Sequence, residues 1–148
     1  MDTIHKKYLY DDPKRLPIKW QRLVTGGETC PRCGNTENEL EQAIEKLRQT
    51  LVPLGIEITL EKEKLNISEF KQDPLQSNRI WINGQPIEKF IKGSVGQSLC
   101  CDVCGPLDCR TVEVGGQTHE TIPVDLIIRA GLIVANQILS LNKTNACC

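Results

Sequence analysis

The sequence has few aromatic residues and no excess of charge of either sign. Aromatic residues make up 4% of its 148 positions, and 18 basic residues stand against 19 acidic ones, which leaves a net charge of −1. A nucleic-acid-binding surface needs clustered basic residues to neutralise phosphates, and it often needs aromatic rings that stack on bases. The composition therefore argues against nucleic acid as a partner.

Long hydrophobic runs are also missing. No apolar stretch follows the segment Met1–Lys7, so we expect no signal peptide. The most apolar segment, Leu126–Ala135, is shorter than the roughly 20 residues of a membrane-spanning helix and contains Arg129. We therefore expect no membrane association and a cytoplasmic location.

The motifs of several common enzyme chemistries are absent as well. The sequence contains no phosphate-binding loop, no Ser-His-Asp order and no paired-carboxylate signature. Its two histidines are His5, near the N-terminus, and His119, in a predicted strand. His119 is either a zinc ligand or, more simply, an exposed strand residue.

Cysteine, in contrast, is plentiful. A chain of this length can bury a core without disulfides, and a reducing compartment favours metal binding or redox turnover over permanent disulfides. The eight cysteines fall into three tight groups: Cys30 and Cys33; Cys100, Cys101, Cys104 and Cys109; Cys147 and Cys148.

Hydrophobic periodicity predicts an alternation of strands and helices. Residues 18–24 alternate apolar and polar side chains, as expected for a half-buried strand. A capping-box pattern from Thr36 to Glu39 predicts the start of a helix that runs to Leu51 and ends before Gly55. The following strands are predicted over 56–61, 79–82, 110–114 and 117–122, with a short helix over 66–73, hairpin turns at Asn83-Gly84 and Gly115-Gly116, and an irregular segment over 93–106.

The final helix is predicted from Pro123 to about Leu141. It is apolar nearly all round, so it is either deeply buried or half-buried with an oligomer contact, which would make a homodimer through this helix.

This order predicts an α/β fold of thioredoxin-like type, with a central mixed sheet flanked by helices. The predicted organisation is an N-terminal arm (1–17), a thioredoxin-like domain (18–141) with a Cys-rich loop insertion (92–109), and a C-terminal tail (142–148).

Cys30-Pro31-Arg32-Cys33 lies between a predicted strand and a predicted helix. A helix N-terminus stabilises a thiolate, and the positive charge of Arg32 between the two sulfurs would add to this effect. Cys30 is then the nucleophile and Cys33 the resolving thiol. If the helix begins only at Thr36, the dipole acts on Cys30 from too far away. The alternative is half of a zinc site.

The second group has a metal-binding spacing. Cys101 and Cys104 form a C-x-x-C turn that supplies two zinc ligands, and Cys109 with Cys100, or with one of Cys30 and Cys33, completes four. The adjacent pair Cys100-Cys101 suits a soft ion such as mercury, a metalloid such as arsenic(III), or a redox pair. A structural clip is the simpler alternative. Cys147 and Cys148 are either incidental or a flexible thiol arm.

Several motifs together carry a family resemblance. They are Cys30–Thr36 (CPRCGNT), Ser77–Gly84 (SNRIWING), Cys100–Gly105 (CCDVCG), Cys109–Val114 (CRTVEV) and Ile127–Gly131 (IIRAG). With them the chain resembles an uncharacterised thioredoxin-like family, a domain of unknown function, from about Ile18 to Leu141. The resemblance implies a thioredoxin-like fold and a set of family cysteines, and it brings no established activity.

The resemblance also shows one departure from working thioredoxins, which carry a cis-proline facing the C-x-x-C. Asn78 stands at about that position, and Pro74 lies four residues too early. Without this proline we expect the sulfurs to be open to a metal ion, and general disulfide reductase activity to be weak.

The leading functional prediction is thiol–disulfide exchange, or handling of a soft metal or metalloid, through Cys30 and Cys33. The partner is then a thiol or disulfide protein or a soft metal ion. The sequence establishes no cofactor, and the candidates are zinc and such a soft metal or metalloid ion. The alternative is a non-enzymatic zinc- or metal-binding module whose cysteines are ligands or clips.

Overall fold

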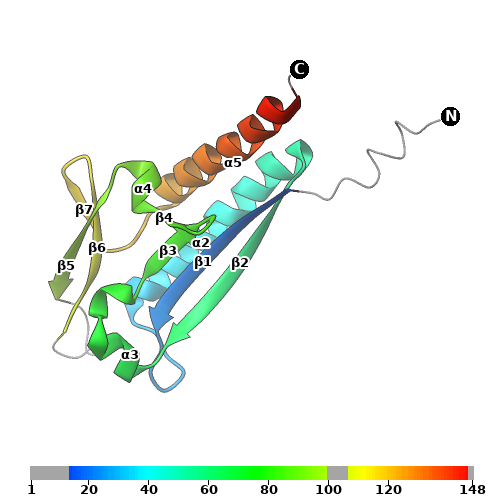
Figure 1. Ribbon diagram of the computed structural model, residues 1–148. Helices are drawn as coiled ribbons and strands as arrows, with labels where there is room; N and C mark the ends of the chain where they lie inside the picture. Colours follow the sequence, from blue (N-terminus) through cyan, green and yellow to red (C-terminus); the bar gives the residue numbers. More distant parts are fainter. Residues whose placement is uncertain (1–13, 100–106, 147–148) are drawn as a thin grey trace.

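Figure 1 shows the computed structural model, which describes residues 14–99 and 107–146. Its main sheet has four strands in the order β2-β1-β3-β4. The central strand β1 (Lys14–Leu23) pairs in parallel with β2 (Ile56–Leu65) and antiparallel with β3 (Arg79–Ile82). β3 pairs antiparallel with the short edge strand β4 (Gln85–Pro86). The prediction of a mixed sheet is confirmed, and β1 begins four residues before its predicted start at residue 18.

The helix α2 (Pro31–Leu51) and the 3-10 turn η1 (Val52–Leu54) connect β1 to the parallel strand β2. The predicted helix face is buried at Leu40, Ile44 and Leu47. Gly55 follows η1 with φ of 81°, a left-handed conformation that costs glycine little, and it turns the chain into β2.

The start of α2 was predicted wrongly at Thr36, because the helix begins at Pro31. Proline fits the first helical position, since its φ is already helical and it has no N–H to satisfy. Thr36 and Glu39 face another helix: the N–H of Ile122 donates to Thr36 Oγ1 (3.3 Å), and the N–H of Val124 donates to Glu39 Oε2 (3.0 Å). The apparent capping box therefore satisfies the N-terminus of α5.

The chain between β2 and β4 follows the prediction closely. The short helix α3 (Ile67–Gln72) opens with a capping box between Asn66 and Glu69, and the 3-10 turn η2 (Pro74–Gln76) follows it. Asn83 and Gly84 both have positive φ, as in the type I′ turn that their sequence predicts between β3 and β4. The one-turn helix α4 (Glu88–Ile91) comes next.

A second sheet follows α4. Its antiparallel strands are β5 (Ser94–Leu99), β6 (Asp108–Val114) and β7 (Gln117–His119), of which only β5 and the first two residues of β6 lie within the predicted insertion 92–109. The predicted hairpin at Gly115-Gly116 is confirmed, since both glycines have positive φ and join β6 to β7. The prediction of an irregular segment over 93–106 is wrong for residues 94–99, which alternate only weakly between half-buried and exposed positions.

The last helix, α5 (Val124–Ala146), continues past its predicted end and includes residues 142–146, which were predicted as tail. Its residues Val124–Leu141 are long and apolar enough to cross a membrane by length and composition alone, so the estimate from Leu126–Ala135 was too short. In this fold 33% of Val124–Leu141 is buried, and α5 packs along α2, where Gly131 lets it approach Leu47 closely. It also exposes Leu132 and Leu141.

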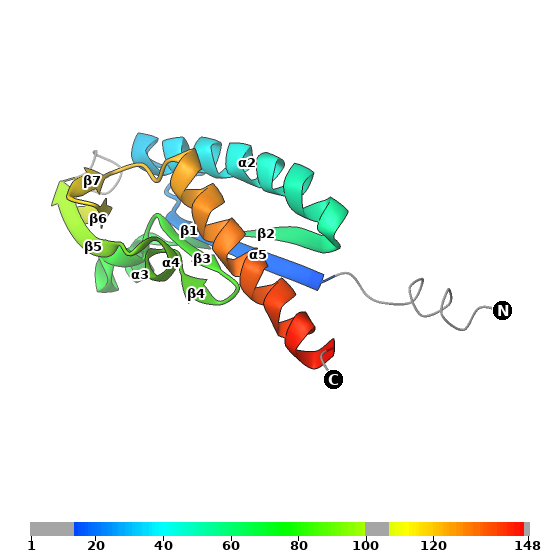
Figure 2. The same cartoon turned by 90° about the horizontal axis from the view of Figure 1, so that it is seen from above.

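Figure 2 shows α2 and α5 side by side on one face of the four-stranded sheet. Between them and the sheet lies the core, whose largest sheet residues are Leu16, Ile18, Trp20 and Ile80. The alternate positions of β1 and β2 face the opposite side, where Lys19, Thr59 and Glu61 remain accessible. The predicted two-residue alternation is confirmed from Ile18 to Trp20 and from Ile56 to Leu60, and it breaks at Gln21, which is buried next to Trp20.

Candidate dithiol site

A tight turn at the end of β1 places Cys30 at the start of α2. Thr25 and Glu28 exchange backbone hydrogen bonds (2.8 and 3.0 Å) around Gly26 and Gly27, which both have positive φ. The hydroxyl of Thr29 donates to the carbonyl of Leu23 (3.0 Å). The chain is thereby fixed at the residue immediately before Cys30.

Cys30 is the N-cap of α2, and its sulfur takes the place of the usual oxygen acceptor. The N–H of Cys33 donates to Cys30 Sγ (3.5 Å), and the N–H of Gly34 donates to the Cys30 carbonyl (2.9 Å). A sulfur at this position faces the positive end of a 21-residue helix. This is the arrangement in which a helix favours a thiolate.

Both sulfurs of the motif are buried. Cys30 is 2% exposed and Cys33 is 1% exposed, and the two belong to the hydrophobic core. The pKa of Cys33 is raised, first because its thiol donates a hydrogen bond to the Cys30 sulfur, then because of burial, and further because of negative charge on Cys30 and Cys109. The pair therefore holds its proton on Cys33 while Cys30 accepts.

Ser77 is a site residue that the sequence analysis did not single out. Its Oγ lies 3.6 Å from Cys33 Sγ, and it accepts the N–H of Leu23 (3.0 Å). Its hydrogen bond to Cys33 lowers the pKa of that thiol, against the raising effects of Cys30 and of burial. The signal available in the sequence was its position: Ser77 directly precedes Asn78, which the sequence analysis compared with the facing proline of thioredoxins.

The guanidinium of Arg32 contacts β5 and the segment after β7. Its guanidinium Nη2 donates to the carbonyl of Leu99 (2.8 Å) and lies 3.3 Å from Glu120 Oε1. Its side chain is 8% exposed, whereas that of Glu120 is 61% exposed. Arg32 thus ties the first turn of α2 to the second sheet, and it is not among the groups that shift the pKa of Cys33.

Asn78 has a structural reason to be asparagine. It is buried with φ of 61°, its Oδ1 accepts the indole N–H of Trp20 (3.1 Å), and its Nδ2 donates to the carbonyl of Glu120 (3.3 Å). No peptide bond among residues 14–99 and 107–146 is cis. The expectation that the missing proline leaves the sulfurs open to a metal ion stays a prediction; both sulfurs are buried, and Ser77 lies against Cys33.

Of the second cysteine group, the structure places Cys109 alone. Cys109 lies on β6, is 1% exposed and belongs to the same core cluster as Cys30 and Cys33. Cys100, Cys101 and Cys104 lie outside the described residues, as do Cys147 and Cys148. Within the described ranges, no three His, Cys, Asp or Glu side chains are grouped closely enough to hold a metal ion, and His119 lies half-buried on β7.

A buried ion pair stands next to Cys109 in the sequence. The Nε and Nη2 atoms of Arg110 donate to Glu88 Oε1 (3.2 and 2.6 Å), and its Nη1 donates to the carbonyl of Leu75 (2.8 Å). Both side chains are less than a tenth exposed. This pair joins β6, α4 and η2 around the segment that leads to Ser77.

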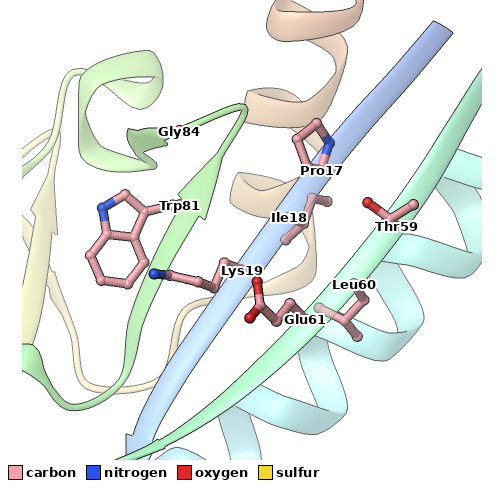
Figure 3. A pocket seen from close by; sticks show the side chains of 8 residues that line it. All are labelled: Pro17, Ile18, Lys19, Thr59, Leu60, Glu61, Trp81 and Gly84. Atoms are coloured by element: carbon pink, nitrogen blue, oxygen red, sulfur yellow. The ribbon is translucent and has the colours of Figure 1, made fainter.

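A groove of about 490 Å³ lies on the opposite side of the main sheet and contains no cysteine among its lining residues. Figure 3 shows Lys19, Glu61 and Trp81 among the side chains that line it. The ammonium of Lys19 and the guanidinium of Arg79 each lie 4.5 Å from the centre of the Trp81 ring. Cation–ring contacts of this kind are ordinary on a solvated sheet face, so we assign no function to the groove.

Comparison with known proteins places the chain in a family. Residues 16–131 match the family model described as "Domain of unknown function (DUF2703)". The chain belongs to this family. It is also 45% identical over 113 residues to an uncharacterized protein of Archaeoglobus fulgidus, a match that covers 76% of this chain and 82% of the relative. No solved structure matches the chain significantly. The predicted resemblance to an uncharacterised family is therefore confirmed at the level of the family.

Proposed function

We propose that this protein carries out thiol–disulfide exchange, with Cys30 as the nucleophile and Cys33 as the resolving thiol, on a scaffold of thioredoxin-like type. The strand order β2-β1-β3-β4, with α2 crossing between the parallel strands β1 and β2, supports this assignment of the scaffold. In this topology the dithiol lies at the connection between the central strand β1 and the helix α2.

One observation carries the proposal: Cys30 Sγ caps α2 by accepting the N–H of Cys33. A thiolate gains from the helix N-terminus, whereas a disulfide or a neutral thiol gains little. The second sulfur lies one helical turn along, donates its hydrogen to Cys30, and is positioned to attack a disulfide formed there.

The reaction needs no group beyond the substrate. The Cys30 thiolate attacks a disulfide R–S–S–R′, forms Cys30–S–S–R and releases R′–S⁻. Cys33 then attacks the Cys30 sulfur, so that the Cys30–Cys33 disulfide forms and R–S⁻ leaves with the proton that Cys33 gives up. The substrate disulfide is reduced to two thiols, and the protein dithiol is oxidised.

Soft metal or metalloid binding is the second candidate, and the position of Cys109 favours it. A thiolate at Cys109 would raise the pKa of Cys33, so this third buried sulfur lies within electrostatic range of the dithiol. The three sulfurs are not grouped closely enough in the described structure to hold an ion as they stand, so binding would require Cys109 to move toward the dithiol. Three thiolates would then suit a soft ion, whereas zinc needs a fourth ligand. In this candidate function the cysteines are ligands, and no exchange takes place.

The test uses the reduced full-length protein and glutathione disulfide. We expect Cys30→Ser to abolish exchange and Cys33→Ser to accumulate a glutathione adduct on Cys30. A matched control is the double change of Cys147 and Cys148 to serine, which removes two thiols and should leave exchange unchanged. An adduct that forms equally well in Cys30→Ser would overturn the proposal.

Metal content separates the two candidates. Protein purified under reducing, anaerobic conditions is analysed for bound metal alongside a thiol count. Stoichiometric metal that disappears in Cys33→Ser, together with no exchange in the wild type, would establish the metal-binding function and exclude the exchange function.

A further inference from the structure

Ser77 joins the dithiol to the backbone of the central strand. It lies just after η2, is 1% exposed, and its Oγ contacts two groups: the N–H of Leu23 at 3.0 Å and the sulfur of Cys33 at 3.6 Å. Leu23 is the last residue of β1, and its carbonyl also accepts the hydroxyl of Thr29, the residue before Cys30. The same residue of β1 therefore anchors both segments that meet at the thiols.

The directions of these hydrogen bonds follow from the donors and acceptors present. The N–H of Leu23 can only donate, so Ser77 Oγ accepts there, and its own hydrogen remains for the sulfur of Cys33. Because Ser77 supplies the hydrogen in its contact with Cys33, the thiol hydrogen of Cys33 is available to the Cys30 sulfur, and this hydrogen bond raises the pKa of Cys33. The groups form one buried chain from Leu23 N–H through Ser77 and Cys33 to Cys30.

We propose that Ser77 is a positioning residue for the resolving step, in which its hydroxyl holds and stabilises the Cys33 thiolate as that sulfur attacks the Cys30 mixed disulfide. This inference rests on the proposed exchange function and specifies how its second step works. Once Cys30 is in a mixed disulfide, it no longer stabilises the proton on Cys33, and that proton leaves with the departing thiolate R–S⁻. A buried thiolate still needs a donor, and Ser77 supplies one.

The sequence allows each thiol to be followed separately. Trypsin cuts after Arg32, so Cys30 appears in the peptide 23–32 and Cys33 in the peptide 33–46. Reduced protein is mixed with glutathione disulfide, quenched with acid at intervals and alkylated. The glutathione adduct on peptide 23–32 reports the first step, and the disulfide that links the two peptides reports the second.

In Ser77→Ala we expect the first step within about threefold of the wild-type rate and the second step slowed about tenfold or more, as for the loss of a hydrogen bond to a charged group. Thr36→Val is the matched control, because it also removes a buried hydroxyl that accepts a backbone N–H, here that of Ile122. Thr36→Val should resolve at the wild-type rate.

The outcomes distinguish this inference from the proposed function. If peptide 23–32 never carries glutathione in the wild type, the exchange function fails. If the adduct forms and Ser77→Ala resolves it as fast as the wild type does, Ser77 has no role in the second step.

A measurement on the wild type covers the case in which Ser77→Ala does not fold. Oxidation of the dithiol should shift the amide proton resonance of Leu23, which donates to Ser77, more than that of Val24, which donates to the carbonyl of Leu65 (3.1 Å). Equal shifts at Leu23 and Val24 would overturn the hydrogen-bond chain.

Discussion

The indole N–H of Trp20 donates to Asn78 Oδ1 across 3.1 Å, inside the core and beside the dithiol. Trp20 lies on the central strand, and Asn78 lies in the loop that holds Ser77 against Cys33. Both residues are almost completely buried, so the hydrogen bond satisfies two polar groups that have no access to water. The asparagine therefore fixes the conformation of this loop.

Substitution of Asn78 tests this role. Asn78→Pro should destabilise the protein by about 3 kcal/mol or more, because proline cannot adopt a φ of 61° and both side-chain hydrogen bonds are lost. Asn78→Gly keeps the backbone conformation accessible and should cost about 1–3 kcal/mol. Urea unfolding of the reduced proteins measures both values, and equal stability of the two variants would contradict the backbone argument.

The Cys30 thiol should ionise before Cys33. We expect the alkylation rate of Cys30 to rise with a midpoint below the value of about 8.5 for an unperturbed thiol, because its sulfur accepts the N–H at the start of α2. The measurement is iodoacetamide labelling against pH, with the tryptic peptides resolved by mass. A midpoint at or above 8.5 for the Cys30 peptide would remove the basis for the nucleophile assignment.

The raised pKa of Cys33 predicts that the folded protein loses stability at alkaline pH. Its pKa is raised in the folded protein, chiefly by its hydrogen bond to Cys30. Above the ordinary thiol value of about 8.5 the unfolded chain releases this proton while the folded chain keeps it. The free energy of unfolding should therefore fall above that pH by up to about 1.4 kcal/mol per pH unit from this group, and it should not change below that pH.

Cys33→Ala provides the comparison for this pH dependence. In this variant the free energy of unfolding should fall less steeply above about pH 8.5. The contributions of the other titrating groups should be unchanged. Unfolding free energies at pH 7, 8.5 and 10 in the presence of reductant decide the matter, and identical slopes for wild type and Cys33→Ala would contradict the raised pKa.

The sequence predicted those parts of the fold that depend on local signals. The alternation in β1 and β2, the Asn83-Gly84 and Gly115-Gly116 turns, and the helical spacing of Leu40, Ile44 and Leu47 all correspond to observed elements. Each of these signals arises from residues a few positions apart, whose backbone preferences do not depend on the rest of the chain.

The errors came from side chains whose partners are distant in sequence. Thr36 and Glu39 have the spacing of a capping box. Their side-chain oxygens instead accept the N–H groups of Ile122 and Val124, which lie more than 80 positions away in the sequence. Ser77 looks like an ordinary loop serine until the fold brings it to Cys33. A single sequence gives no sign of such pairs, because any exposed loop can carry the same residue types.

Arg32 should contribute more to stability than to the ionisation of Cys30. Arg32→Ala leaves the carbonyl of Leu99 without its donor and should cost about 1–3 kcal/mol in urea unfolding. Glu120→Gln is the matched control, since its carboxylate is largely exposed and should contribute less than about 1 kcal/mol. A change of the Cys30 alkylation midpoint in Arg32→Ala, without any loss of stability, would instead place the charge of Arg32 at the sulfurs.

Removing one partner of the ion pair between Arg110 and Glu88 should destabilise the protein strongly, whereas replacing both partners with apolar residues should destabilise it less. Both side chains are buried, so Glu88→Gln leaves the charge of Arg110 uncompensated and should destabilise the protein by about 3–5 kcal/mol. The double variant Glu88→Leu, Arg110→Met removes both charges and should be more stable than Glu88→Gln. The exposed pair of Lys62 and Glu41 gives the reference, because Glu41→Gln should cost less than about 1 kcal/mol. Equal losses in Glu88→Gln and Glu41→Gln would show that water reaches the Arg110 pair, and that the pair does not hold β6 and α4 together.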